Sequence, residues 1–282
     1  MRFGIIADVH ANIEALTIAL DTLDSEGVEQ IICLGDITGY NANPRECLLA
    51  IKEREIPTIR GNHERYIVGV AHESLKNDTL QMTEWTQAQL KEEDYKYIEN
   101  MPNKMQHEAG FLITHGSPRN KDEYILKINS FIQNLKLLEE KHPDVKVCFH
   151  GHTHLPSAVA RGHIVQDIHE DKEIKLDPEK VYLINPGSVG QPRDHCSKTS
   201  FGIYDSDNSI FYFYRRTYDV ESAQKKILDI GISGAVIKFS SSVAPGIAFS
   251  SIKTKIVVPI FILSPVFRIF IRIFLLLRYV PL

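Results

Sequence analysis

Cysteine is scarce in this sequence of 282 residues, which has only four, and no two of them are spaced as a CxxC pair. A disulfide-stapled scaffold is therefore excluded. Two of the four lie inside apolar runs, which indicates buried free thiols. Free thiols are typical of a reducing compartment, so we expect a cytoplasmic protein. The four cysteines are at positions 33, 47, 148 and 196.

The amino terminus lacks the long apolar segment of a secretory signal, because Asp8 and His10 fall within its first ten residues. Internal repeats and low-complexity stretches are lacking as well. With 43% hydrophobic and 24% charged residues, the composition excludes a disordered or collagen-like chain. It is typical of a globular protein with one or two domains.

Acidic residues are missing after Asp229, where six Lys and Arg side chains remain. The first 229 residues carry 26 basic and 36 acidic groups, so the body of the protein is acidic. Proteins that bind the phosphate backbone of nucleic acids need clustered Lys and Arg. We therefore expect no nonspecific or sequence-specific binding to nucleic acid.

Apolar patterning in the first part of the chain alternates between strands and helices. Residues 2–6 and 29–35 read as strands, and 57–60 as a short strand. Between them, apolar residues at helical spacing predict helices over 13–27 and 44–54, the second opened by Pro44. This alternation predicts a layered α/β sheet.

The pattern becomes β-rich after residue 155. Before that point we expect one or two helices over 79–99, a strand at 111–115, a helix at 128–140 and a strand at 145–150. The later strands are predicted at 157–160, 163–168, 180–184, 201–205 and 209–216, followed by a helix at 219–229.

Side chains that can bind metal follow each confident strand of the first half. The carboxyl ends of strands in an open α/β sheet share one edge, so these residues can converge. Two carboxylates, an amide oxygen and four imidazoles are enough for two adjacent divalent ions. Mixed nitrogen and oxygen ligands favour Mn, Fe, Zn, Co or Ni over Mg or Ca. The residues are Asp8, His10, Asp36, Asn62, His115, His152 and His154.

Two metal ions about 3.5 to 4 Å apart have a specific chemical use. They hold the attacking and the leaving oxygen of an in-line displacement at phosphorus, and they lower the pKa of a bound water. One carboxylate must bridge the two ions. The alternative interpretation is that these polar residues merely cap helices and turns at strand ends.

Five ordered motifs give the chain a resemblance to the calcineurin-like metallophosphoesterase superfamily. They are DVH at 8–10, GDITG at 35–39, GNHE at 61–64, HG at 115–116 and GHTH at 151–154. NPGSVGQPRD at 185–194 and GDITGYNANPREC at 35–47 resemble the small bacterial and archaeal phosphodiesterase branch. The resemblance covers residues 1–230, which we expect to form the phosphoesterase domain, with 231–282 as a basic, apolar tail. It implies an α/β fold of four layers, with a two-sheet β sandwich flanked by helices.

The resemblance also implies a set of ligands for each of the two metal ions. Asp8, His10 and His154 would hold the first ion, and Asn62, His115 and His152 the second, with Asp36 bridging both. We expect Mn first, with Fe, Zn, Ni or Co as alternatives.

Four further residues border the implied site. His63 resembles the family residue that protonates the leaving oxygen, which suits a histidine outside the metal shell. Glu64 would help to orient His63, or would only favour the dipole of a helix start. Asn12 and Arg193 would contact phosphate oxygens; the structural alternatives are a helix cap for Asn12 and an ion pair with Asp194 for Arg193.

The activity implied is hydrolysis of a phosphodiester or phosphomonoester, with a metal-bound hydroxide as nucleophile and His63 as general acid. The motifs describe the reaction centre, and they leave open the substrate, which depends on loops such as 64–78, 116–127 and 190–198, and the oligomeric state. A noncatalytic metal-binding scaffold of the same fold is the alternative, and loss of His63 or of a ligand would mark it. Neither loss is seen.

The tail contains an apolar run at 256–267 that two prolines interrupt. Residues 266–280 could form a helix of about 22 Å, shorter than the roughly 30 Å hydrocarbon core of a bilayer. Its three arginines fall on one arc, which is compatible with an interfacial helix and peripheral membrane contact through 256–280. The alternatives are docking on a protein surface and a carboxyl terminus altered by a shifted reading frame.

Overall fold

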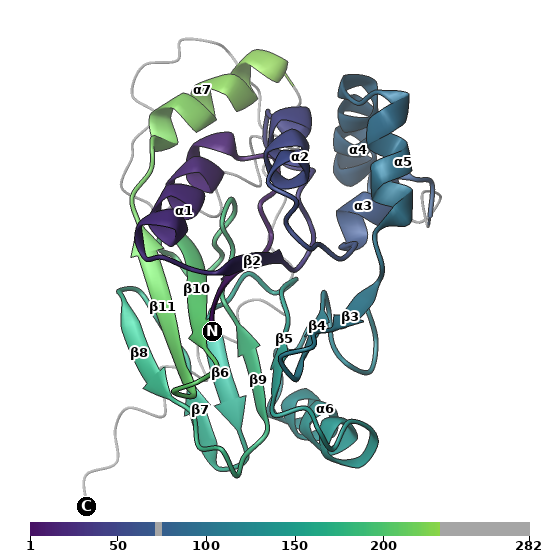
Figure 1. Cartoon of the computed structure of the whole chain (residues 1–282). Helices are drawn as coiled ribbons and strands as arrows, with labels where there is room; N and C mark the ends of the chain where they lie inside the picture. The colour runs from purple at the N-terminus through teal and green to yellow at the C-terminus, as the bar shows by residue number, and fades with distance from the viewer. Residues whose placement is uncertain (71–74, 232–282) are drawn as a thin grey trace, which may run out of the picture. The chain divides into compact units, whose positions relative to one another are not determined.

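Two β sheets lie face to face at the centre of the fold (Figure 1). The computed structural model describes residues 1–70 and 75–231, which belong to one compact unit. Within them, the first sheet has the strand order β2 (Gln30–Cys33), β1 (Arg2–Ile6), β10 (Thr199–Asp205), β11 (Ile210–Arg216) and β8 (Lys172–Lys175). The second has the order β3 (Lys104–Gln106), β4 (Phe111–Thr114), β5 (Val147–Phe149), β9 (Tyr182–Asn185), β6 (Ser157–Ala160) and β7 (His163–Val165).

Both sheets are mixed, and their parallel strands determine where the functional loops meet. In the first sheet β1 is parallel to β2, while β10, β11 and β8 are antiparallel to their neighbours. In the second sheet β4, β5 and β9 are parallel to one another. Parallel neighbours end at the same edge, so the loops after β1 and β2 meet, as do those after β4, β5 and β9.

The main core fills the space between the sheets. Along β1, Phe3 and Ile5 face the second sheet, because side chains alternate in direction along a strand. Phe111 of β4 packs edge-on against Phe3 and against Phe149, with ring centroids 5.1 and 5.3 Å apart. Burial of each such side chain contributes about 1.5 to 3 kcal/mol. This shared core joins the two sheets into a sandwich.

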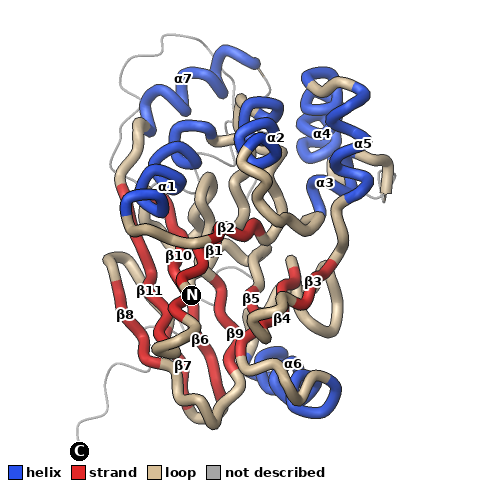
Figure 2. The backbone as a smooth tube through the Cα atoms, in the orientation of Figure 1, coloured by secondary structure: helices blue, strands red, loops and turns tan. Residues whose placement is uncertain are grey.

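Helices cover the outer face of each sheet (Figure 2). Apolar residues of α1 (Ile13–Ser25) and α2 (Pro44–Glu53) pack on the first sheet, and those of α6 (Ile128–Lys141) on the second. Beside α2 lie α3 (Asn62–Ile67), α4 (Asn77–Gln89) and α5 (Glu92–Asn100), and α7 (Val220–Ile230) contacts α1. The predicted four-layer α/β sandwich is therefore confirmed.

Some local predictions differ from the structure. Residues 57–60 form only one bridge, Thr58 to Cys33, rather than a strand, and the strand expected over 163–168 ends at Val165. The polar strands β3 and β8 and the six-residue helix α3 were not predicted, because short elements with few apolar residues lack a clear apolar period. The segment 79–99 forms two helices, α4 and α5.

The four cysteines are free, and Cys33 and Cys148 of the apolar runs are buried, as predicted; Cys47 is buried as well. The cytoplasmic location that they suggested stays a prediction. No helix among residues 1–70 and 75–231 is long and apolar enough to cross a membrane. The predicted helix at 266–280, the membrane contact through 256–280 and almost all of the predicted tail lie outside the described residues.

Candidate metal centre

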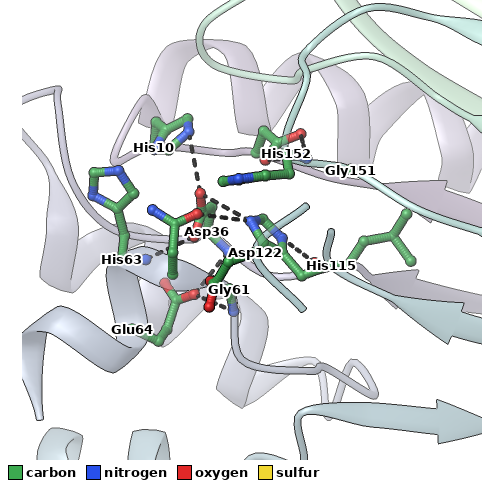
Figure 3. Close-up of polar contacts among 12 residues, drawn as sticks. His10, Asp36, Gly61, His63, Glu64, His115, Asp122, Gly151 and His152 are labelled. Carbon is green, nitrogen blue, oxygen red and sulfur yellow. Dashed lines mark hydrogen bonds and ion pairs between the residues drawn. The ribbon is translucent and has the colours of Figure 1, made fainter. Parts of the chain in front are cut away.

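The loops that follow β1, β2, β4 and β5, together with the start of α3, bring the predicted ligands into one buried cluster. Figure 3 shows His10, His115 and His152 around Asp36, with His63 beside them. All seven predicted metal-binding side chains are buried: Asp8, His10, Asp36, Asn62, His115, His152 and His154.

The cluster divides into two groups that share one carboxylate. The first ligand group is Asp8, His10, Asp36 and His154, and the second is Asp36, His115 and His152. In each group one donor atom per residue lies within 4.8 Å of the others. Asn62 joins the second group, since its Oδ1 lies 3.0 Å from Nε2 of His115. This division matches the two ligand sets that the resemblance implied, with Asp36 common to both groups.

The backbone at these positions is unusual. Five residues of the cluster have φ between 49° and 67°, in the left-handed region: Asp8, His10, Asp36, His152 and His154. Such residues cost about 1 to 3 kcal/mol each and persist only where the surroundings impose them. Here the amides of Asp8 and His10 donate to the carbonyls of Gly35 and Asp36, at 3.1 and 2.8 Å. The two loops therefore hold each other in shape.

Hydrogen bonds to backbone carbonyls orient three of the imidazoles. Nδ1 of His10 lies 3.1 Å from the Thr38 carbonyl, and Nδ1 of His154 lies 2.6 Å from that of Gln191. Nδ1 of His115 lies 2.8 Å from the carbonyl of Leu34. A carbonyl only accepts, so each Nδ1 carries a proton, and the Nε2 of each neutral imidazole presents a lone pair to the cluster. This is the usual arrangement of a metal-binding histidine.

The donor set fits divalent cations. Nε2 of His10 and Nε2 of His154 are 3.0 Å apart, so two lone pairs face each other. Nε2 of His115 lies 3.0 Å from Oδ1 of Asn62 and 3.2 Å from Oδ2 of Asp36, so two acceptor oxygens converge on one nitrogen that carries at most one proton. The facing lone pairs of His10 and His154 repel each other unless a cation lies between them.

A further sign of a missing partner lies in the second group. Nε2 of His152 is buried and has no hydrogen-bond partner within the described part of the chain. A buried polar atom without a partner costs about 1 to 3 kcal/mol. A nearby ion or an ordered water would remove that cost.

Burial keeps most of these imidazoles neutral. It lowers the pKa of His10 and of His154 well below the ordinary value, and that of His152 to about 3. Burial also lowers the pKa of His115, but the adjacent Asp36 carboxylate outweighs it and raises this pKa to about 9. Neutral imidazoles are the form that binds metal, so among these imidazoles a metal ion must displace a proton only at His115.

The pKa values of the two carboxylates in the cluster, Asp8 and Asp36, are shifted in opposite directions. Burial raises the pKa of Asp8 to about 7. Burial acts in the same direction on Asp36, but His115 and His63 outweigh it and bring the pKa of Asp36 well below its ordinary value. The shared carboxylate is therefore ionised, as a bridging ligand must be.

Glu64 supports the loop that carries Asp36. Its carboxylate accepts from the amide of Asp36 at 2.7 Å, from the amide and hydroxyl of Thr38 at 3.1 Å, and from the amide of Gly61 at 2.9 Å. The last bond also fixes the start of α3, which carries His63. Glu64 thus acts on His63 through the backbone of α3, and its main effect is on the position of Asp36.

His63 lies beside the cluster but belongs to neither ligand group of the described residues. Its amide donates to Oδ1 of Asp36 at 2.9 Å, and its ring centroid is 4.8 Å from that of His10. Gly39 makes room for the imidazole, because a Cβ at that position would overlap the His63 ring. The structure therefore places this imidazole next to the metal centre.

Asn12 and Arg193 differ in their burial and in the contacts that their side chains make. The Asn12 side chain accepts from the amide of Ala15 and donates to the carbonyl of Gly190, and it is fully buried. The side chain is therefore a helix cap, and the phosphate contact expected of Asn12 stays a prediction. Arg193 is half-buried and bonds to Gln191 at 3.1 Å, while Asp194 pairs with Arg215 instead.

Three tyrosines at the site were not predicted. Tyr40 lies 4.6 Å from His10 and 4.5 Å from His63 between ring centroids, and the Tyr66 ring is 5.5 Å from His63. Tyr124 lies 3.8 Å from His152. Tyr40 and Tyr66 are next to motifs, so their positions gave a weak signal, whereas Tyr124 lies in a loop that no motif marks.

Residues 1–209 match the model of the calcineurin-like phosphoesterase superfamily domain. An uncharacterized protein of Methanocaldococcus jannaschii is 32% identical over 233 residues, which are 80% of this chain and 91% of that protein.

Two solved structures extend the comparison. A metallophosphoesterase of Sphaerobacter thermophilus is 32% identical, with a TM-score of 0.73 over 86% of this chain and all of the other. A hypothetical protein of Pyrococcus horikoshii shares the fold at 21% identity, with a TM-score of 0.69 over 86% of this chain and 99% of the other.

Proposed function

The chain belongs to the calcineurin-like phosphoesterase superfamily, and on that premise we propose that it is a dinuclear metal-dependent phosphoesterase. The observation that carries the proposal is the position of Asp36 in both ligand groups. A shared carboxylate between two sets of histidines is the arrangement that holds two ions close enough to act on one phosphoryl group.

The seven predicted ligands would hold the two ions, in the two groups described above. When bound, such ions supply an activated water and neutralise charge on the phosphoryl oxygens. We infer Mn as the first candidate, with Fe, Zn, Ni or Co as alternatives, because the ligands mix imidazole nitrogen with carboxylate and amide oxygen.

His63 is the proposed general acid. Its ring lies beside His10 and next to Tyr40, at the edge of the metal centre, where a leaving oxygen would emerge. A histidine can hold and release a proton near neutral pH, which a metal-bound imidazole cannot do. Arg193, half-buried at the same edge, would contact a phosphoryl oxygen.

A noncatalytic scaffold of the same fold is the second candidate. The observations favour it less, because the donor set is complete and His63 is present beside it. A scaffold would have no need of an imidazole at that position.

Hydrolysis by the full chain tests the proposal. Metal-stripped protein would be assayed with bis-p-nitrophenyl phosphate and with p-nitrophenyl phosphate after separate addition of Mn²⁺, Ni²⁺, Zn²⁺ or Mg²⁺. We expect Mn²⁺ or Ni²⁺ to restore turnover, and the preferred ester separates a phosphodiesterase from a phosphatase. Two bound ions without turnover of either ester would favour the scaffold.

Two substitutions separate the proposed roles. His63→Ala should lower kcat by about 10² to 10⁴ with metal content unchanged, as for a lost general acid. Asp36→Asn should lower both the rate and the metal content. Rates and bound metal would be measured on the same samples. Equal metal loss in the two variants would contradict the distinction.

A further inference from the structure

Aromatic side chains gather over the metal centre from three separate segments. Tyr40 comes from the loop after β2, Tyr66 from α3 and Tyr124 from the loop between β4 and α6. Each of their rings lies within 5.5 Å of a histidine of the site, between centroids. The cluster is therefore bordered by flat, apolar ring faces with polar hydroxyl groups at their rims.

Tyr124 differs from the other two because it is exposed. Its ring stacks on that of His152, with centroids 3.8 Å apart and an angle of 32° between the planes. Nevertheless 48% of the residue's surface remains open to solvent. One face of the ring is thus covered by a candidate metal ligand, while much of the rest is available to a ligand.

Arg193 lies near the hydroxyl end of the Tyr124 ring. Burial raises the pKa of the Tyr124 hydroxyl, and the nearby Arg193 guanidinium acts against it. This guanidinium is held in place by Oε1 of Gln191, to which it donates a hydrogen bond at 3.1 Å. An exposed aromatic ring with one face already packed loses little conformational freedom when a ligand stacks on it.

Arg193 brings a positive charge to the same place. Its backbone amide donates to the carbonyl of His154 at 3.4 Å, so Arg193 lies beside the first ligand group. The positive charge of Arg193, the flat ring of Tyr124 and the candidate metal centre are therefore neighbours. An ester with a phosphoryl group and a planar aromatic group matches all three.

We propose that Tyr124 and Arg193 form a subsite for a planar aromatic group of the substrate, and that this group is the base of a nucleoside phosphate ester. The inference rests on the proposed phosphoesterase function, because it assumes that the phosphoryl group lies at the metal centre. Aryl phosphates such as phosphotyrosine share the planar ring, and they are the competing source of that chemistry.

Matched ligands test the subsite on the full, Mn²⁺-loaded chain. Adenosine 5′-monophosphate and ribose 5-phosphate differ only in the base, and phosphotyrosine and phosphoserine differ in the ring. Their inhibition constants would be measured against bis-p-nitrophenyl phosphate, and their dissociation constants by calorimetry on metal-free protein. Stacking of one base gives about a 5- to 150-fold preference, so we expect adenosine 5′-monophosphate to bind at least about fivefold tighter than ribose 5-phosphate.

Substitutions at Tyr124 assign the preference to its ring. Tyr124→Leu keeps much of the bulk but lacks the flat face, and should bring the two affinities together. Tyr124→Phe retains the ring and should keep the preference. Leu126→Ala, in the same loop and 56% exposed, is the matched control and should change neither. Metal content would be measured in all variants, because Tyr124 contacts His152.

The outcomes separate this inference from the proposed function. Turnover of the diester with equal affinities for adenosine 5′-monophosphate and ribose 5-phosphate would overturn the subsite and leave the phosphoesterase intact. A preference that survives Tyr124→Leu would overturn it too. A preference for phosphotyrosine over phosphoserine alone would overturn the nucleotide assignment. A base preference by calorimetry without turnover by any metal would instead overturn the proposed function.

Discussion

The two ligand groups of the metal centre differ in how firmly their histidine side chains are held. In the first group, both imidazoles have Nδ1 bonded to a backbone carbonyl, from Thr38 for His10 and from Gln191 for His154. In the second, only His115 is anchored to a carbonyl, while His152 lies under the exposed ring of Tyr124 and has an unpartnered Nε2 among the described residues. The imidazoles of the first group are therefore both fixed by hydrogen bonds, whereas the second group has one fixed imidazole and one that lies next to an exposed ring.

This difference indicates that the two groups bind their metal ions with different affinities. Metal ligands fixed by hydrogen bonds behind them bind more tightly than ligands that can turn. A site that exchanges water and substrate needs an accessible position, which the second group, nearer to Tyr124, supplies. We therefore expect the first group to hold its ion tightly and the second to hold its ion more weakly and next to the substrate.

Removing one histidine from each group gives the largest test of that difference. His152→Ala should leave one tightly held ion, whereas His154→Ala should weaken the tight site. Outer partners of metal ligands are worth about 10- to 100-fold in affinity, so loss of a ligand itself should cost more than about 100-fold. Chelator titration followed by elemental analysis measures the release of both ions. Identical release curves for the two variants would refute the expected difference in affinity between the two groups.

Glu64→Gln should have an intermediate effect on both groups together. Gln retains the shape, but its amide group would meet amides that now donate to the carboxylate of Glu64. Because these bonds hold the Asp36 loop, we expect both ions to bind about 10- to 100-fold less tightly. Metal titration checks this, with the exposed Glu99→Gln on α5 as control. Weakening of one ion alone would show that the Asp36 loop serves only one group.

Asn12→Ala should have the smallest effect, and on the first group alone. The cap of α1 is worth about 1 kcal/mol, which urea denaturation would measure. The freed carbonyl of Gly190 precedes Gln191, which anchors His154, so the tight ion should be slightly weakened. Asn12→Asp keeps the capping oxygen and should recover most of the stability. A higher KM with unchanged stability would instead support Asn12 as a phosphate ligand.

The sequence allowed most of the metal centre to be predicted, because each ligand follows a recognisable feature. Asp8 and Asp36 come directly after apolar strands, and parallel strands end at one edge. Asn62 follows no true strand, since 57–60 forms only one bridge, so its place depended on the motif GNHE. The motifs predicted which residues meet, and the strand pattern explained why.

The rest could not be predicted, because it depends on how loops from distant segments meet. The stack of Tyr124 on His152 requires the loop between β4 and α6 to fold back over the loop after β5. Nothing in the local sequence around Tyr124 reports that contact. Likewise, a capping residue and a phosphate ligand look alike in sequence, and the capping role of Asn12 is visible only in its hydrogen bonds.

The left-handed backbone at five of the ligands limits how this centre can evolve or be redesigned. Asn, Asp, His and Gly enter that region far more readily than other residues, and β-branched residues hardly enter it at all. At Asp8, His10, Asp36, His152 and His154 the main chain thus restricts which amino acids are acceptable before any ion binds. A change to Cys would carry a conformational cost even if a thiolate-preferring metal were abundant. The shape of these loops therefore favours exchange among imidazole, carboxylate and amide donors, and it resists conversion to a thiolate site.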